Sequence, residues 1–106
     1  MTPNPGEVGL FDLGMVEKIR PALVVSSRFS DQDRALVTFV PHTTALRGAQ
    51  FEIPVRVGFL KPCAFLVQAV NTRTAALAMR KLGSFPSTEF DRVFEGLLRW
   101  LGHSPV

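Results

Sequence analysis

The stretch RPALVVS, residues 20–26, is the clearest sign of a β-sheet in this chain of 106 residues. Ala22–Ser26 is rich in β-branched residues and carries no charge, which is typical of a strand buried on both faces. Pro21 biases the backbone of Arg20 toward an extended conformation. We therefore predict a buried strand with an arginine at its entrance.

Two apolar segments on either side of this stretch predict neighbouring strands. Val8–Asp12 is a short apolar segment, and Ala35–Val40 is a longer one. Pro41 ends the second segment because proline has no N–H group to donate to a central ladder.

Two later segments predict further strands. Phe51–Val57 alternates apolar and polar residues, which favours a half-buried strand. Pro54 places this strand toward the edge of a sheet, for the reason just given. Ala64–Val70 is hydrophobic throughout except for Gln68 and predicts a buried strand.

The connecting segments are polar or ambiguous. Arg28–Asp33 is turn-like, and Leu13–Ile19 and Thr44–Gln50 are predicted as loops. Thr72–Met79 is predicted to form one or two helical turns, and Arg80–Phe85 is a candidate for a last short strand.

A C-terminal amphipathic helix is predicted from residue 87 or 88 onward. Ser87 or Thr88 would act as the N-cap, and Glu89 would place negative charge in the first turn. Gly102 is positioned to end the helix. One apolar face at helical spacing consists of Phe90, Val93, Phe94, Leu97, Leu98 and Leu101.

Together these segments predict one mostly β domain of five or six short strands with a terminal helix. Strands this closely spaced favour a small barrel or a strongly curved sheet. A hydrophobic content of 46% with nine phenylalanines is ample for one packed core. No apolar run reaches the roughly 18 residues that a membrane span needs.

The chain's charge and targeting signals say little about partners but favour the cytoplasm. Its formal net charge of +3 permits a polyanionic partner without requiring one. The N-terminus lacks the basic and apolar regions of a secretory signal, so we expect a cytoplasmic protein that does not associate with membranes.

Several kinds of site are excluded by the residues available. The chain has no glycine-rich nucleotide-binding motif and no Gly-x-Ser-x-Gly sequence. Its only histidines are His42 and His103, and Cys63 is its only cysteine, so no metal site and no cofactor are expected. Cys63 lies in an apolar context and is predicted to be a plain buried residue rather than a reactive thiol.

Two segments could carry chemistry. Arg20 would present a planar guanidinium that suits a phosphate, although a solvated arginine at a strand end looks the same in sequence. In FVPHTTALRG, residues 39–48, Thr43 and Thr44 offer hydroxyl donors, and His42 is the nearby group able to titrate near neutral pH. The alternative is that these threonines are simply turn residues.

The order of these segments resembles the MazF/PemK family of toxin endoribonucleases. The resemblance begins with GEVGLFDL at residues 6–13, RPALVVS at residues 20–26 and VTFVPHTT at residues 37–44. It continues through FEIPV at residues 51–55, LVQ at residues 66–68 and RKLG at residues 80–83, and it includes the terminal helix. The ordered set carries the resemblance, since no single motif is specific.

The resemblance implies a small SH3-like barrel of the CcdB/PemK type with added helices, assembled as a homodimer. It implies metal-independent cleavage of single-stranded mRNA at short sequences by attack of the ribose 2′-hydroxyl. The products would carry a 2′,3′-cyclic phosphate or 3′-phosphate and a 5′-hydroxyl. An acidic antitoxin of the MazE type would bind and silence the enzyme.

The resemblance also assigns roles to particular residues. The family's active arginine falls on Arg20, and its active threonine falls on Thr43. Our candidates for holding the RNA are Lys18, Thr44, Arg47 and Gln68, and His42 is the candidate acid or base.

Two departures from the family pattern and two alternative functions accompany this interpretation. The loop Leu13–Ile19 is shorter than in many relatives, and Val67 stands where an acidic residue often precedes the glutamine.

One alternative function is that of a non-catalytic relative that only binds RNA or an antitoxin. The other is a gyrase-poison-like toxin on the same fold, for which Trp100 is a faint indication, although a packing role for Trp100 is favoured.

Overall fold

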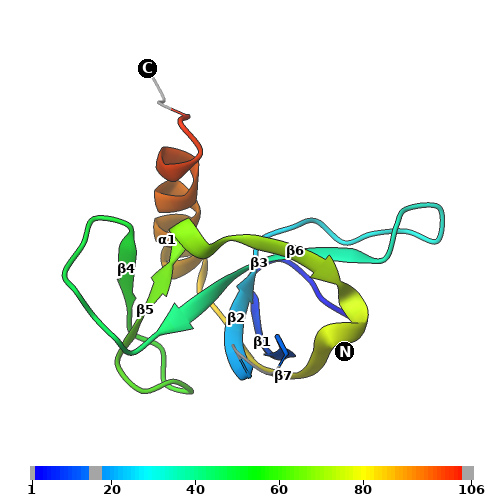
Figure 1. Ribbon diagram of the computed structural model, residues 1–106, viewed down its shortest axis with the longest axis horizontal. Helices are drawn as coiled ribbons and strands as arrows, with labels where there is room; N and C mark the ends of the chain where they lie inside the picture. Colours follow the sequence, from blue (N-terminus) through cyan, green and yellow to red (C-terminus); the bar gives the residue numbers. More distant parts are fainter. Residues whose placement is uncertain (1, 15–17, 104–106) are drawn as a thin grey trace.

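The computed structural model describes residues 2–14 and 18–103, which form a curved antiparallel sheet and one C-terminal helix (Figure 1). Its elements in chain order are β1 (Glu7–Asp12), β2 (Ile19–Val24), β3 (Leu36–Thr43), β4 (Glu52–Val55), β5 (Cys63–Leu66), the 3₁₀ turn η1 (Val67–Ala69), β6 (Asn71–Thr74), the 3₁₀ turn η2 (Ala75–Leu77), β7 (Ala78–Ser84) and α1 (Ser87–Trp100).

Strand β3 organises the sheet because it pairs with three other strands. The strand order is β4-β5-β3-β2-β1-β7, and β6 pairs with β3 off this path. Residues 39–41 of β3 pair with β2, its first half pairs with β6, and His42 and Thr43 pair with β5. The strand therefore continues past Pro41, and the prediction that Pro41 ends it is wrong. Strands β1, β2, β3, β6 and β7 curl around one centre in Figure 1. Within the described residues no pairing joins β4 to β7, so the barrel-like sheet is not closed.

Strand β2 is buried on both faces, as its composition predicts. Ala22, Leu23 and Val24 are fully buried. Leu23 packs in a core shared with the helix and with β4 and β5. Ala22 and Val24 pack in a second core with Phe11 and Phe39, whose stacked rings have centroids 4.6 Å apart. The alternation of strand side chains thus supplies two cores at once.

Helix α1 covers the first core with part of its predicted apolar face. Val93 and Leu97 are buried, whereas Leu101 is 62% exposed. The predicted cap is wrong: the N-cap is Pro86, and among the residues that the structure describes no side-chain cap hydrogen bond is made at this end of the helix. Pro86 already has the extended conformation that an N-cap needs, so the helix begins one residue earlier than a polar cap would place it. Gly102 follows the helix with a φ of 84°, in line with its predicted role.

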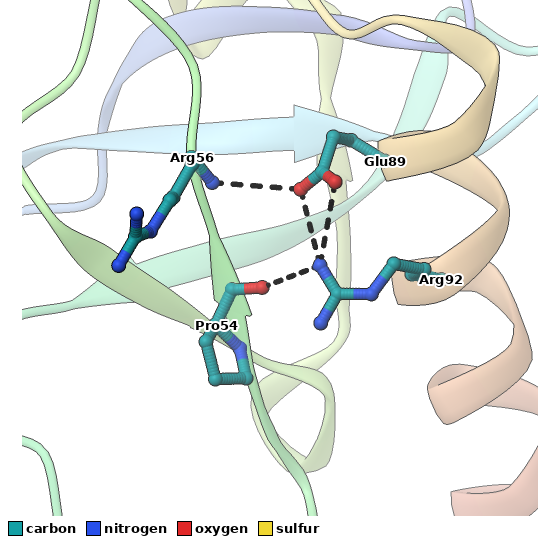
Figure 2. A network of polar contacts seen from close by, with 4 residues as sticks. All are labelled: Pro54, Arg56, Glu89 and Arg92. Carbon is teal, nitrogen blue, oxygen red and sulfur yellow. Dashed lines mark hydrogen bonds and ion pairs between the residues drawn. The ribbon is translucent and has the colours of Figure 1, made fainter.

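The edge position of β4 is confirmed, and α1 reaches over that edge. Pro54 has no N–H, and its carbonyl oxygen accepts a hydrogen bond from Arg92 Nη1 at 2.8 Å (Figure 2). Arg92 also pairs with Glu89 Oε2 at 3.1 Å, and the backbone N–H of Arg56 donates to the same oxygen at 3.5 Å. The network blunts an edge that would otherwise expose unpaired polar groups.

Two sequence predictions fail between β5 and β7. Residues 72–79 form the end of β6, the turn η2 and the start of β7, not the predicted helical turns. Pairing with β3 overrides the helical tendency of the alanines, and Thr72 contributes a 2.7 Å hydroxyl contact with Thr38. The strand predicted over residues 64–70 ends at Leu66, so Gln68 lies on the 3₁₀ turn η1. Across residues 2–14 and 18–103 the sheet therefore has seven strands rather than five or six.

Two further features bear on the predictions from sequence. Residues 15–17 of the predicted loop 13–19 lie outside the described residues, while the strand predicted over residues 80–85 is confirmed as β7. No helix in the part of the chain that the structure describes is long and apolar enough to cross a membrane.

Candidate functional site

Arg20 and Thr43 lie just beyond the point where β2 and β3 stop pairing. The last pair of this ladder is Ala22 and Pro41, two residues from Arg20 on one strand and two residues from Thr43 on the other. Both residues line one cavity of about 220 Å³. The remaining lining residues are Leu13, Phe39, Pro41, His42, Leu66, Ala69 and Asn71. Two residues that are far apart in sequence therefore face the same space.

Arg20 is the second residue of β2 and is exposed, whereas the strand becomes buried two residues later. The strand thus holds the backbone of Arg20 while the residue lines the cavity. The positive charge of Arg20 acts on His42, because it is one of the causes that lower the pKa of His42. A planar cation at this position suits an anionic group with two free oxygens.

Thr43 is both a turn residue and a cavity residue. It is the last residue of β3, and its Oγ1 accepts a hydrogen bond from the backbone N–H of Ala45 at 3.1 Å. An accepted hydrogen bond leaves the hydroxyl's own hydrogen available to donate. The local turn therefore fixes the side chain without using its donor.

His42 lies between these residues in the sequence and lines the same cavity. Its Nδ1 atom is buried and has no hydrogen-bond partner among the described residues, and its ring is tilted against Phe65. Burial, the largest cause, lowers the pKa of His42 below the ordinary 6.5; its own backbone acts in the opposite direction, and the charge of Arg20 lowers it further. The imidazole is therefore neutral at neutral pH, as a proton acceptor must be.

A second cavity of about 330 Å³ adjoins the first, because Thr43 and Leu66 line both. Arg47 and Gln68, two of the predicted RNA-binding residues, line this second cavity. The two cavities together place a cation, an amide and a hydroxyl along one stretch of surface.

The other two predicted RNA-binding residues line neither cavity. Thr44 is exposed directly after β3. Lys18 is exposed where the chain enters β2 and has a φ of 60°, and its backbone bonds to both Leu13 and Gly14. This uncommon backbone conformation determines the direction in which the Lys18 side chain leaves the edge of the sheet.

Sequence reasoning missed two polar residues of this region. Asn71, the first residue of β6, lines the first cavity. Glu52, the first residue of β4, lines the second cavity, and its carboxylate accepts backbone N–H groups of the preceding segment. A glutamate shortly after a polar segment with Gly48 is a signal for such an arrangement, because a glycine in the left-handed region turns successive N–H groups toward one acceptor.

The described residues contain no group of three or more His, Cys, Asp and Glu that could hold a metal ion. Cys63 is buried, and burial raises the pKa of its thiol, so it is a plain core residue as predicted. Trp100 packs the edge of its ring system against Phe51, with centroids 5.3 Å apart, in the packing role predicted for it.

The fold of the whole chain is similar to that of several solved structures. An endoribonuclease in complex with its cognate antitoxin, from a mycobacterial species, has a TM-score of 0.84 at 21% identity, over 98% of this chain and 99% of that one. A MazE–MazF complex from Deinococcus radiodurans has a TM-score of 0.83 at 21% identity over the same shares. The Mycobacterium tuberculosis toxin MazF-mt6 has a TM-score of 0.78 at 21% identity, over 92% of this chain and 98% of that one. At this identity the likeness concerns the fold.

In sequence, no curated protein matches the chain. The family model of the PemK-like, MazF-like toxins of type II toxin–antitoxin systems matches residues 4–101, which include every strand, the helix and both cavities. The chain belongs to this family of PemK-like, MazF-like toxins.

Proposed function

We propose that this protein is a metal-independent endoribonuclease that cuts single-stranded mRNA and thereby inhibits translation and growth. One observation carries the proposal: Arg20, His42 and Thr43 line a single cavity. A guanidinium, a neutral imidazole and a hydroxyl are the groups needed to bind a phosphate, accept a proton and stabilise developing charge.

The proposed reaction needs no nucleophile from the protein. The 2′-oxygen of a ribose attacks the adjacent phosphorus, the bond from phosphorus to the 5′-oxygen of the next nucleotide breaks, and the leaving oxygen takes a proton from water. The products are a 2′,3′-cyclic phosphate, which water can open to a 3′-phosphate, and a 5′-hydroxyl. Since the nucleophile is the 2′-hydroxyl, DNA is not a substrate.

Arg20 and Thr43 would act on the phosphate in this reaction. Arg20 neutralises two non-bridging oxygens and stabilises the pentacoordinate transition state. Thr43 donates its hydroxyl hydrogen to a non-bridging oxygen while Ala45 holds the side chain in place. The backbone of Arg20 is held in β2 and the Thr43 side chain by its bond to Ala45, which limits the reorganisation that accompanies the chemical step.

His42 would take the proton of the attacking 2′-hydroxyl. Its lowered pKa keeps the ring neutral, and it lines the same cavity as the two phosphate-binding groups. A proton acceptor beside the phosphate site accelerates attack by raising the negative charge on the nucleophile.

The RNA on either side of the cut would follow the second cavity and the rim. Arg47 supplies backbone attraction and Gln68 a base-edge contact in the second cavity. Thr44 and Lys18, which are exposed and line neither cavity, would contact the strand from the adjoining surface.

Two protein partners complete the proposal. The protein acts as the toxin of a type II pair, in which an acidic antitoxin of the MazE type binds a chain of net charge +3. MazE–MazF complexes of similar fold support this assignment. It acts as a homodimer, which would cover some of its exposed apolar side chains.

The test is incubation of the purified protein with single-stranded RNA and the equivalent DNA in the presence of EDTA, followed by analysis of the new ends. Cleavage of RNA alone with 5′-hydroxyl ends supports the proposal. RNA that is bound but stays intact would identify a non-catalytic relative. Inhibition of DNA supercoiling with intact RNA would identify a gyrase poison.

A further inference from the structure

Residues 44–50, which make up all but the last residue of the connection from β3 to β4, form one wall of the second cavity. Ala45, Arg47 and Ala49 of this β3–β4 segment line the cavity together with Gln68. Every residue of the segment is exposed, and the structure assigns it no strand or helix. Packing therefore contributes little to its position, and its hydrogen bonds decide where Arg47 lies.

The carboxylate of Glu52 makes most of those hydrogen bonds. The backbone N–H of Arg47 donates to Glu52 Oε1 at 2.8 Å and to Oε2 at 3.2 Å. The N–H of Ala49 donates to Oε1 at 3.1 Å, and the N–H of Glu52 donates in return to the carbonyl of Ala49 at 3.2 Å. Gly48, between the two donors, has a φ of 68°, the left-handed conformation that turns neighbouring N–H groups toward one anion.

A carboxylate is at first sight misplaced in a cavity proposed to bind RNA, because it repels phosphates. Its oxygens are, however, occupied by backbone N–H groups of the cavity wall, and these bonds lower the pKa of Glu52 and keep it charged. Hydrogen bonds to an ionised acceptor are stronger than those to a neutral one. The negative charge thus strengthens the hydrogen bonds that hold the cavity wall, which a neutral side chain would hold less firmly.

The other end of the β3–β4 segment is attached to the first cavity. The N–H of Ala45 donates to Thr43 Oγ1, so the segment is held by Thr43 at its start and by Glu52 at its end. Loosening the Glu52 end would free Arg47 and weaken the bond that fixes the Thr43 hydroxyl.

We propose that Glu52 is a positioning residue for RNA: its carboxylate holds the β3–β4 segment so that Arg47 and Thr43 meet the same strand. This inference rests on the proposed ribonuclease function. Glu52 does not touch the reacting phosphate and acts through the segment.

The test compares Glu52→Gln with the matched change Glu89→Gln. Glu89 also accepts a backbone N–H and pairs with an arginine, but it lies on α1 beside β4 (Figure 2) and lines neither cavity. Amide hydrogen exchange would be followed by NMR at Arg47 and Ala49, with buried Phe65 as the reference for global stability. RNA affinity would be measured with a mixed-sequence single-stranded RNA carrying 2′-O-methyl groups, and cleavage kinetics with the unmodified RNA.

In Glu52→Gln we expect exchange at Arg47 and Ala49 to rise by about three- to tenfold, in line with the loss of one hydrogen bond. RNA binding weakens and KM rises by a similar factor, with a smaller fall in kcat. Glu89→Gln leaves these two amides and KM unchanged. Gly48→Ala, which strains the same turn from the segment side, should loosen the same amides as Glu52→Gln.

Unchanged exchange at Arg47 and Ala49 in Glu52→Gln would overturn the inference, as would loosened amides with unaltered RNA affinity. These two results are distinct from failure of the proposed function. In that case wild-type protein would leave RNA intact, while the exchange and affinity measurements would still decide the role of Glu52.

Discussion

Arg20 on β2 and Thr43 on β3 line the same cavity, and each lies two residues beyond Ala22 and Pro41, the last pair of the β2–β3 ladder. Neither residue needs a flexible loop to reach this position. The sheet that builds the core therefore also builds the candidate phosphate site, and its rigidity is what a preorganised site requires.

The geometry of the Arg20 guanidinium should matter as well as its charge. We expect Arg20→Ala to lower kcat/KM for RNA by about 10²–10³, because a preorganised charge-stabilising donor is lost. Arg20→Lys keeps the charge but not the planar fork, so it should recover only part of that loss. Single-turnover cleavage of one RNA by the three proteins measures both effects. Full activity of Arg20→Lys would contradict bidentate binding.

The contribution of the Thr43 hydroxyl to kcat should be separable from the contribution of the side chain's shape. Thr43→Val keeps the branched side chain but removes the donor, and we expect a loss of about 10² or more in kcat. Thr43→Ser keeps the hydroxyl and should stay within about tenfold of wild type. Equal activity of the serine and valine variants would show that the hydroxyl takes no part.

The role of His42 predicts a pH dependence. Burial lowers its pKa below 6.5, so the neutral ring that accepts a proton is lost only as the pH falls through this lowered value. The acid limb of kcat/KM should therefore have its midpoint below pH 6.5 and be absent in His42→Gln, whose remaining activity is low. A limb that persists unchanged in His42→Gln would assign the titration to another group.

Gly96 sets how closely α1 approaches β4. A Cβ at this position would lie 2.7 Å from Ile53 Cδ1 and 3.0 Å from its Cγ1. Crowding of this kind costs about 1–3 kcal/mol, while alanine favours a helix over glycine by about 1 kcal/mol. We expect Gly96→Ala to lower the free energy of unfolding by about 1 kcal/mol net.

Denaturant unfolding provides the measurement, with Gly58→Ala as its control. Gly58 has no atom near its hypothetical Cβ, so its substitution should change stability little. A Gly96→Ala protein more stable than wild type would show that the helix moves away from β4 without cost.

The sequence predicted best those segments whose local pattern and tertiary role agree. The composition of β2 indicated burial on both faces, and Pro54 indicated an edge strand. It predicted residues 72–79 poorly because their helical tendency is overridden by pairing with β3, a contact more than thirty residues distant in sequence. The sequence also places Gln68 in a strand, because the apolar run of residues 64–70 does not show that the strand ends at Leu66 and η1 begins.

The candidate site was predictable in part for the same reason. Arg20 stands at the start of one apolar segment and Thr43 after the end of the next, so a sheet can bring them together, and both line one cavity. Glu52 and Asn71 were missed because their contributions depend on which backbone amides and which cavity they meet after folding. Only the paired strands create those neighbours.

The most direct test of the central claim is a double-mutant cycle on RNA cleavage with wild type, Arg20→Ala, Thr43→Val and the double variant, in the presence of EDTA. If both side chains act on one phosphate, each single change lowers the rate by about 10²–10³ and the double change costs less than the product of the two. RNA left intact by the wild-type protein, or cutting that survives both substitutions, would contradict the account.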